Sequence, residues 1–178
     1  MKRSELKHMP EYFDRYINKC DDIELLDALQ TCLNEAEQFP VDKWKALGDN
    51  VYAPGKWTVK DILQHLIDAE RIFCYRALSF ARKEPQRMLS FEENDYAANA
   101  GAVERDLEDL INELKIVHQS SLALYKSFTL VMLEEMGKAF KGEYSVAAIG
   151  FIIAGHQRWH MQVLEEKYYP MLAATPAV

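Results

Sequence analysis

Apolar residues recur at intervals of three and four along most of the chain, which is the spacing of one face of an α-helix. Four stretches carry such an apolar stripe, over residues 23–39, 58–82, 102–127 and 145–168. No stretch shows a convincing alternation of apolar and polar residues, which would indicate a β-strand. The pattern therefore predicts an all-α protein built as a four-helix bundle.

Capping and breaking residues support the limits of these helices. Pro40 ends the first stretch, and Pro85 follows the second. Thr58 followed by Asp61 resembles a capping box, with Asp in place of the usual Glu or Gln. Ser145 can cap the fourth helix.

The connections between the predicted helices differ in character. Residues 44–57 contain several Gly, Pro, Asp and Asn residues and are predicted to form a loop. Residues 91–101 and 129–143 are each expected to hold a short helical turn. Residues 1–20 are predicted to be an N-terminal extension, and residues 170–178 a loose tail.

Composition narrows the class of protein. With 178 residues, of which 49% are hydrophobic, residues 1–178 are expected to form a single domain. The net charge of −7 and the lack of a dense Lys/Arg cluster argue against nucleic acid or membrane as partners. The chain has no apolar run of membrane-spanning length and no apolar signal core, so a cytoplasmic location is expected. Cys20, Cys32 and Cys74 are an odd set and are expected to be reduced thiols.

Two histidines of the fourth helix indicate a metal site. His156 and His160 lie four residues apart on the apolar stripe, so their side chains share one face of the helix. Two buried imidazoles are costly to leave without partners, and one divalent metal satisfies both. His65 lies on the stripe of the second helix, where a single histidine is more often a hydrogen-bonded core residue. Whether His65 lies at the same depth in the bundle as His156 depends on whether the second and fourth helices run parallel or antiparallel. Spacing alone does not decide this.

Other polar residues near these histidines are weaker candidates. Gln157 stands where a zincin-type motif needs a general-base Glu, which disfavours peptide hydrolysis of that type. Cys74 lies on the opposite side of the second helix from His65 and is rejected as a ligand. Asp68, one turn after His65, can orient a ligand imidazole or a metal-bound water, or it can form a surface salt bridge with Arg71.

The two remaining histidines are not expected to bind metal. His118 is predicted to have a structural role at the surface or in the core, and His8 is expected to lie in solvent.

Three neutral imidazoles suit Zn²⁺, Ni²⁺ or a related divalent ion. Three protein ligands leave a coordination position open, as in catalytic sites. The metal would lower the pKa of bound water to about 7 or favour a bound thiolate, and either provides a nucleophile at neutral pH.

Three segments resemble a known family. The run Ala53–Arg76, which includes Trp57 and His65, the segment Phe91–Tyr96 and the run Ser145–His160 are similar to the DinB-like superfamily, in the expected order. The resemblance spans roughly residues 25–169. It implies a four-helix bundle, often a homodimer, with a divalent metal bound by His65, His156 and His160. It also implies metal-dependent thiol transferases or isomerases that use a low-molecular-weight thiol such as bacillithiol, mycothiol or glutathione.

The chain departs from the family pattern at two positions. Gln157 and Trp159 stand where the family often has Glu and His, which puts acid/base help from position 157 in doubt. Trp159 can form a pocket wall or pack between helices, and packing is the favoured interpretation. The leading hypothesis is a metal-dependent transferase or hydrolase of small molecules. The alternatives are a non-enzymatic helical dimer with a structural or sensory metal and a plain scaffold with packed histidines.

Overall fold

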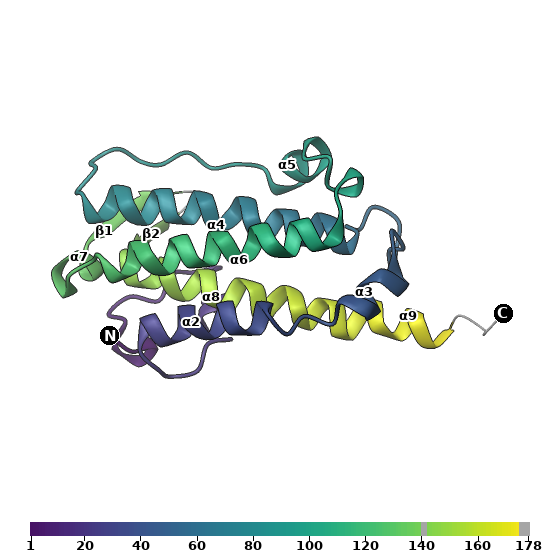
Figure 1. The fold of residues 1–178 in the computed structure, drawn as a ribbon. Coiled ribbons are helices and arrows are strands. Elements are labelled where there is room, and N and C mark those ends of the chain that lie inside the picture. The colour runs from purple at the N-terminus through teal and green to yellow at the C-terminus, as the bar shows by residue number, and fades with distance from the viewer. Residues whose placement is uncertain (140–141, 175–178) are drawn as a thin grey trace.

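The computed structural model describes residues 1–139 and 142–174. Four long helices run alongside one another (Figure 1). They are α2 (Leu25–Ala36), α4 (Val59–Ala81), α6 (Leu107–Lys126) and α8 (Val146–Val163). Both α4 and α2 pack against α6 and α8, which places α2 and α4 diagonally across the bundle. The predicted four-helix bundle is therefore confirmed.

The helices of this bundle run in an up-down-down-up order. The contact between Cys74 and Ser121 and the hydrogen bond from Arg105 to Gln64 show that α4 and α6 run in the same direction. Tyr168, just beyond α8, donates to the carbonyl of Trp57, just before α4, so α4 and α8 are antiparallel. Parallel neighbours need long crossover connections, which explains the length of the segment between α4 and α6.

Short helices occupy the connections. Between α4 and α6 lie α5 (Glu93–Asn99) and the 3₁₀ turn η2 (Ala102–Glu104), and α7 (Leu130–Glu134) follows α6. Helical turns were expected in both places. The prediction of a loop over residues 44–57 is wrong at its start, because α3 (Val41–Leu47) is helical. Trp44 and Leu47 are buried, and the Trp44 indole donates to Tyr169, so tertiary packing stabilises a helix that is too short to be stable alone.

A small β-hairpin precedes α8 and was not predicted. Strands β1 (Met136–Ala139) and β2 (Gly142–Ser145) pair antiparallel, with Gly137 opposite Tyr144. The strands are only four residues long, too short for a clear alternation in the sequence. Gly137 lies against the ring of Phe80, so a side chain at this position would collide with α4.

The two ends of the chain are more ordered than expected. Residues 1–20, expected to be an extension, contain the 3₁₀ turn η1 (Arg3–Glu5) and α1 (Asp14–Ile17), and α1 packs against α8. Beyond α8, the π-helical turn η3 (Leu164–Tyr168) continues into α9 (Tyr169–Ala174). Residues 170–174 are therefore helical rather than a loose tail, and residues 175–178 lie outside the described residues.

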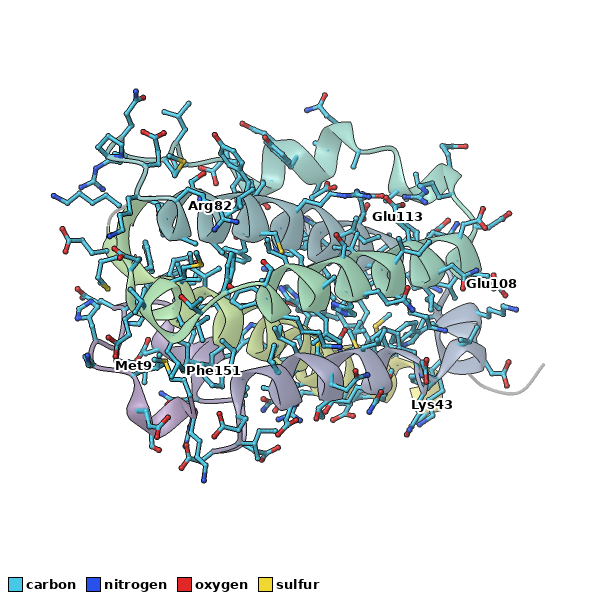
Figure 2. The ribbon with its side chains drawn as sticks, turned by 60° about the vertical axis from the view of Figure 1, so that its left-hand side comes forward. Met9, Lys43, Arg82, Glu108, Glu113 and Phe151 are labelled. Carbon is cyan, nitrogen blue, oxygen red and sulfur yellow. The ribbon has the colours of Figure 1, made fainter. Side chains whose placement is uncertain are left out.

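The core has an apolar cluster at each end of the bundle, with a polar layer between them. One cluster includes Phe73, Phe80 and Phe151, and the other includes Leu63 and Leu114. Figure 2 shows side chains filling the space between the long helices, while charged residues cover the outside. Six buried polar residues lie between the two clusters along the helices: His65, Glu70, His118, Ser121, His156 and Gln157. In the described part of the chain, no helix combines the length and apolar character needed to cross a membrane.

Candidate metal centre

The starts of α4 and α8 are held by side-chain caps. The Thr58 hydroxyl accepts from the backbone N–H of Asp61 at 3.1 Å, and Asp61 Oδ2 accepts from the N–H of Thr58 at 2.9 Å. Ser145 Oγ accepts from the N–H of Ala148 at 3.0 Å. The capping residues predicted from the sequence are thus confirmed. They define where each helix begins and so which residues face the interior.

Three imidazoles meet between α4 and α8. His65 Nε2 and His160 Nε2 each lie 3.1 Å from His156 Nε2. One possible ligand nitrogen from each ring lies within 4.8 Å of the other two. The antiparallel direction of the helices makes this possible, since His65 lies near the start of α4 and His156 lies a similar distance from the end of α8. The structure therefore brings together all three histidines that the sequence singled out.

Burial keeps these imidazoles neutral. His65 and His156 are buried, and His160 is partly buried. Burial lowers the pKa of His65 to about 4 and that of His160 to about 3. It also places the pKa of His156 well below the ordinary value, with further lowering by the two neighbouring histidines. Each ring therefore has a nitrogen lone pair available near neutral pH, which is the form that binds metals.

The three histidines do not satisfy one another. His156 Nε2 faces two other ring nitrogens, yet it carries either one proton or one lone pair. It therefore cannot form two good hydrogen bonds at once. His160 Nδ1 is also buried without a hydrogen-bond partner among the described residues. A divalent ion coordinated by the converging nitrogens would resolve this conflict, so the donor set fits a metal such as Zn²⁺ or Ni²⁺.

Aromatic rings hold the imidazoles in place. The Trp57 ring lies 4.7 Å from that of His65 and stacks on that of His160 at 6.4 Å, between ring centroids. The Tyr16 ring lies 4.8 Å from that of His156. These contacts limit ring rotation and cover the site with apolar surface.

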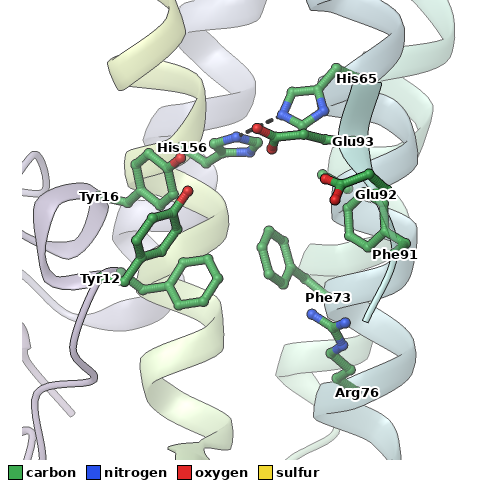
Figure 3. A pocket seen from close by; sticks show the side chains of 11 residues that line it. Tyr12, Tyr16, His65, Phe73, Arg76, Phe91, Glu92, Glu93 and His156 are labelled. Atoms are coloured by element: carbon green, nitrogen blue, oxygen red, sulfur yellow. Dashed lines mark hydrogen bonds between the residues drawn. The ribbon is translucent and has the colours of Figure 1, made fainter. Parts of the chain in front are cut away.

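A pocket of about 120 Å³ opens beside His65 and His156 (Figure 3). Its walls come from α1 and the residues just before it, from α4, from α8 and from the segment that leads into α5. Aromatic rings dominate the lining, with Arg76 at one end and the carboxylates of Glu92 and Glu93 at the rim. A second pocket touches His160 and is lined by Trp57, among others. The histidines are therefore accessible to a small molecule.

Asp68 has different neighbours from those predicted. Its carboxylate accepts a hydrogen bond from Gln64 Nε2 at 3.0 Å, one turn earlier in α4. Arg71, the alternative partner, binds Glu113 at 2.7 Å. Burial raises the pKa of Asp68. An orienting role for Asp68 toward the histidines stays a prediction.

Gln157 points into the bundle, away from the pocket. Its side-chain oxygen lies 2.7 Å from His118 Nε2, and its amide nitrogen donates to the carbonyl of Cys32 at 2.9 Å. His118 Nδ1 in turn lies 2.8 Å from Glu70. Position 157 therefore contributes to the polar layer. His118 is a core residue, one of the two alternatives predicted for it.

The remaining sequence candidates lie where they were expected. Cys74 contacts Ser121 at 3.0 Å and is not part of the histidine cluster. Trp159 packs on Tyr16 of α1, with ring centroids 5.7 Å apart, in agreement with a packing role. His8 is exposed, and the three cysteines are free thiols.

Sequence reasoning missed the contribution of the N-terminal segment to the site. Tyr12, Phe13 and Tyr16 line the pocket, and Tyr12 has a positive φ of 73°, which is unusual for a bulky residue. The aromatic spacing of Phe13 and Tyr16 is a helical signal that could have indicated a packed element. Arg76 and Glu93 also line the pocket, and nothing in their local pattern separates them from ordinary helix-surface charges.

Comparison with known proteins agrees with the geometry. The family model described as the DinB superfamily matches residues 5–164. Among solved structures, YfiT from Bacillus subtilis, described as a probable metal-dependent hydrolase with an unusual four-helix bundle topology, is similar with a TM-score of 0.66. The sequence identity is 18%, and the match covers 90% of this chain and 88% of that chain, so this likeness shows a shared fold. No curated protein matches the chain.

Proposed function

The chain belongs to the DinB superfamily, and from that premise we propose that it is a metal-dependent enzyme acting on a small molecule. His65, His156 and His160 would bind one divalent ion, Zn²⁺ or Ni²⁺. The single observation that carries this proposal is the convergence of three neutral, mutually unsatisfied ring nitrogens at the wall of a pocket.

The ligand set favours catalysis over a purely structural metal. Among the described residues, no Cys, Asp or Glu lies close enough to the three histidines to be a fourth ligand. Structural zinc sites are closed by four protein ligands, whereas catalytic sites keep a position for water or substrate. A divalent ion held by three imidazoles supplies Lewis acidity, which shifts the pKa of coordinated water or thiol toward neutrality.

The residues around the histidines would prepare the reaction. Trp57 and Tyr16 shield the rings from solvent, and the apolar pocket lining would exclude bulk water around a bound substrate. In Figure 3 the Glu93 carboxylate points toward the histidines, and Glu93 lies near enough to Tyr16 to influence its pKa. We assign Glu93 Oε as the acceptor of the proton that the nucleophile loses.

Hydrolysis is the leading reaction class, because the structurally similar YfiT is described as a probable metal-dependent hydrolase. Transfer of a low-molecular-weight thiol is the second candidate, since the same open position and proton acceptor would serve a thiol. Assays for ester or amide hydrolysis, with and without added thiol, distinguish the two. A homodimer in the cytoplasm remains a prediction from the sequence.

Elemental analysis tests the proposal directly. The purified protein should hold close to one Zn²⁺ or Ni²⁺ per chain. His156→Ala should lose nearly all of it while His8→Ala, at an exposed histidine, retains it. A wild-type protein that stays metal-free, and whose melting temperature does not change on adding Zn²⁺ or Ni²⁺, would rule the proposal out.

A further inference from the structure

We propose that Arg76 binds a carboxylate of the substrate, so that the enzyme acts on small apolar carboxylic acids whose reactive end reaches the histidines. This inference rests on the proposed function for the location of the reaction. The guanidinium of Arg76 itself, however, makes its described contacts to Leu89, Phe73 and Phe91 rather than to the three histidines.

Arg76 lies on the same face of α4 as His65. Eleven residues separate them, which is about three helical turns and roughly 16 Å along the axis. Ala69 and Phe73 lie between them on that face, and all four residues line the same pocket. Helical side chains lean toward the N-terminus, so the guanidinium extends from its Cα toward the histidines. Figure 3 shows it pointing toward Phe73.

The charge of Arg76 is buried without a counter-ion. The residue is 4% exposed, and no carboxylate forms an ion pair with it in residues 1–139 and 142–174. Its described hydrogen bond goes to the neutral carbonyl of Leu89 at 2.7 Å. A guanidinium has five N–H donors and cannot be deprotonated in a protein, so most of its donors are still available. Fully buried arginines are normally paired.

The surroundings of Arg76 favour a planar anion. Its guanidinium carbon lies 6.0 Å from the ring centroids of both Phe73 and Phe91, which border it with apolar surface. Low polarity strengthens a charge-assisted hydrogen bond, and a guanidinium binds a carboxylate through two parallel N–H donors. Along α4, the wall between Arg76 and His65 consists of the apolar side chains of Ala69 and Phe73, while Glu92 and Glu93 lie at the rim. The ligand is therefore expected to have an uncharged middle.

The carboxylates of Glu92 and Glu93 suggest a competing interpretation, in which the pocket binds an organic cation. Both residues are exposed, so water already solvates their charges. Arg76 is almost completely buried, so water solvates its charge much less, and leaving this charge unpaired costs more than leaving two rim carboxylates in water. The balance favours an anionic ligand at the Arg76 end of the pocket.

A matched set of ligands tests the charge preference. The full-length protein, before and after Zn²⁺ loading, is titrated by calorimetry with mercaptohexanoate, mercaptohexanol and aminohexanethiol. These share a thiol and a chain and differ in the charge of the far end. Hexanoate, which has no metal-binding thiol, is tested with the metal-free protein. Mercaptohexanoate should bind about ten- to a hundredfold more tightly than the alcohol, and the amine should bind no better than the alcohol.

Variants locate the effect. Arg76→Gln should remove the advantage of the carboxylate and leave the affinity for mercaptohexanol nearly unchanged. Arg82→Gln, at an exposed arginine at the end of the same helix, should retain it. Equal affinity for the acid and alcohol in the wild type would overturn the inference without any variant. An equal loss for every ligand in Arg76→Gln would also overturn it, since Arg76 would then only anchor the segment around Leu89.

The outcome is separable from that of the proposed function. If the wild type takes up no metal but binds hexanoate in an Arg76-dependent way, the carboxylate site stands and the metal site fails. If it takes up Zn²⁺ but shows no preference for the acid, the metal site stands and this inference fails.

Discussion

At the scale of residues, the polar layer links all four long helices through one chain of contacts. Glu70 of α4 accepts from Ser121 and contacts His118, both of α6. His118 contacts Gln157 of α8, which donates to the Cys32 carbonyl of α2. Such a buried network is favourable only when every member is satisfied. Gln157 contacts α6 and α2 through this network, while His156, the preceding residue of α8, faces His65 of α4.

Replacement of Glu70 by Ala should reveal the cost of breaking this network. The variant leaves His118 without its carboxylate partner in the core, while Ser121 keeps the Val117 carbonyl as an acceptor, so the free energy of unfolding should fall by about 3–5 kcal/mol. Urea unfolding followed by circular dichroism measures this change. Glu104→Ala, at an exposed residue of η2, should change it by less than about 0.5 kcal/mol. A fall below about 1 kcal/mol for Glu70→Ala would mean that the network is dispensable.

The pH dependence of stability should report on His118. Burial opposes its charged form, but Cys32 and Glu70 outweigh this and raise its pKa well above 6.5. Because the folded protein then holds the proton more tightly than the unfolded chain, this contribution is complete below pH 6.5. It is lost as the pH rises through the raised pKa. Urea unfolding of the metal-free protein above pH 6.5 should show falling stability, with a smaller slope in His118→Gln. An unchanged slope in the variant would exclude His118 as the source.

At the scale of elements, the contact between α1 and α8 depends on one glycine. A Cβ on Gly155 would lie 1.8 Å from the carbonyl oxygen of Tyr16, so only glycine allows the two helices this close. The approach places Tyr16 on the ring of His156 and brings the residues before α1 into the pocket wall. A local feature of α8 thus positions a segment that precedes it by more than a hundred residues.

Gly155→Ala should therefore destabilise the protein, although alanine is the better helix former. Helix propensity alone would add up to about 1 kcal/mol of stability. The clash with α1 should instead lower the free energy of unfolding by about 1–3 kcal/mol. Fluorescence of Trp159, which packs on Tyr16, should shift as α1 moves away. Ser120→Ala, at an exposed position of α6, serves as the propensity control, and a gain in stability for Gly155→Ala would contradict the close packing.

At the scale of the whole molecule, the histidines join two helices that are far apart in the sequence. The pocket also opens between α4 and α8. The two apolar clusters lie on either side of the histidines along the bundle. A metal bound there would link the folding of the two helices to its own binding, because the unfolded chain cannot bring the three nitrogens together.

Metal removal should therefore lower global stability. At a free metal concentration a hundred times the dissociation constant, binding to the folded state alone adds about 2.7 kcal/mol. Urea unfolding in the presence of Zn²⁺ or of a chelator measures this difference for the wild type. In His65→Ala the difference should nearly vanish. Equal sensitivity of the wild type and His65→Ala to the chelator would show that the metal binds elsewhere.

Much of the fold could be predicted because the signals are local. The apolar stripes, Pro40 and the caps at Thr58 and Ser145 depend on residues within one or two turns of each other, and the structure agrees with them. The pair His156 and His160 was predictable for the same reason, since helical geometry alone brings them to one face. The family resemblance further indicated His65, although spacing left its partner uncertain.

Tertiary structure decided whatever depends on how the helices are arranged. The antiparallel packing of α4 on α8 brings His65 to His156, and the crossing segment before α5 places Glu93 and Leu89 over α4. The short α3 and the hairpin form because burial and pairing stabilise elements that are too short to be stable alone. Arg76 has an unremarkable place in the sequence of its helix. Only packing removes water from its charge, because desolvation is a property of the assembled fold rather than of a residue and its neighbours along the chain.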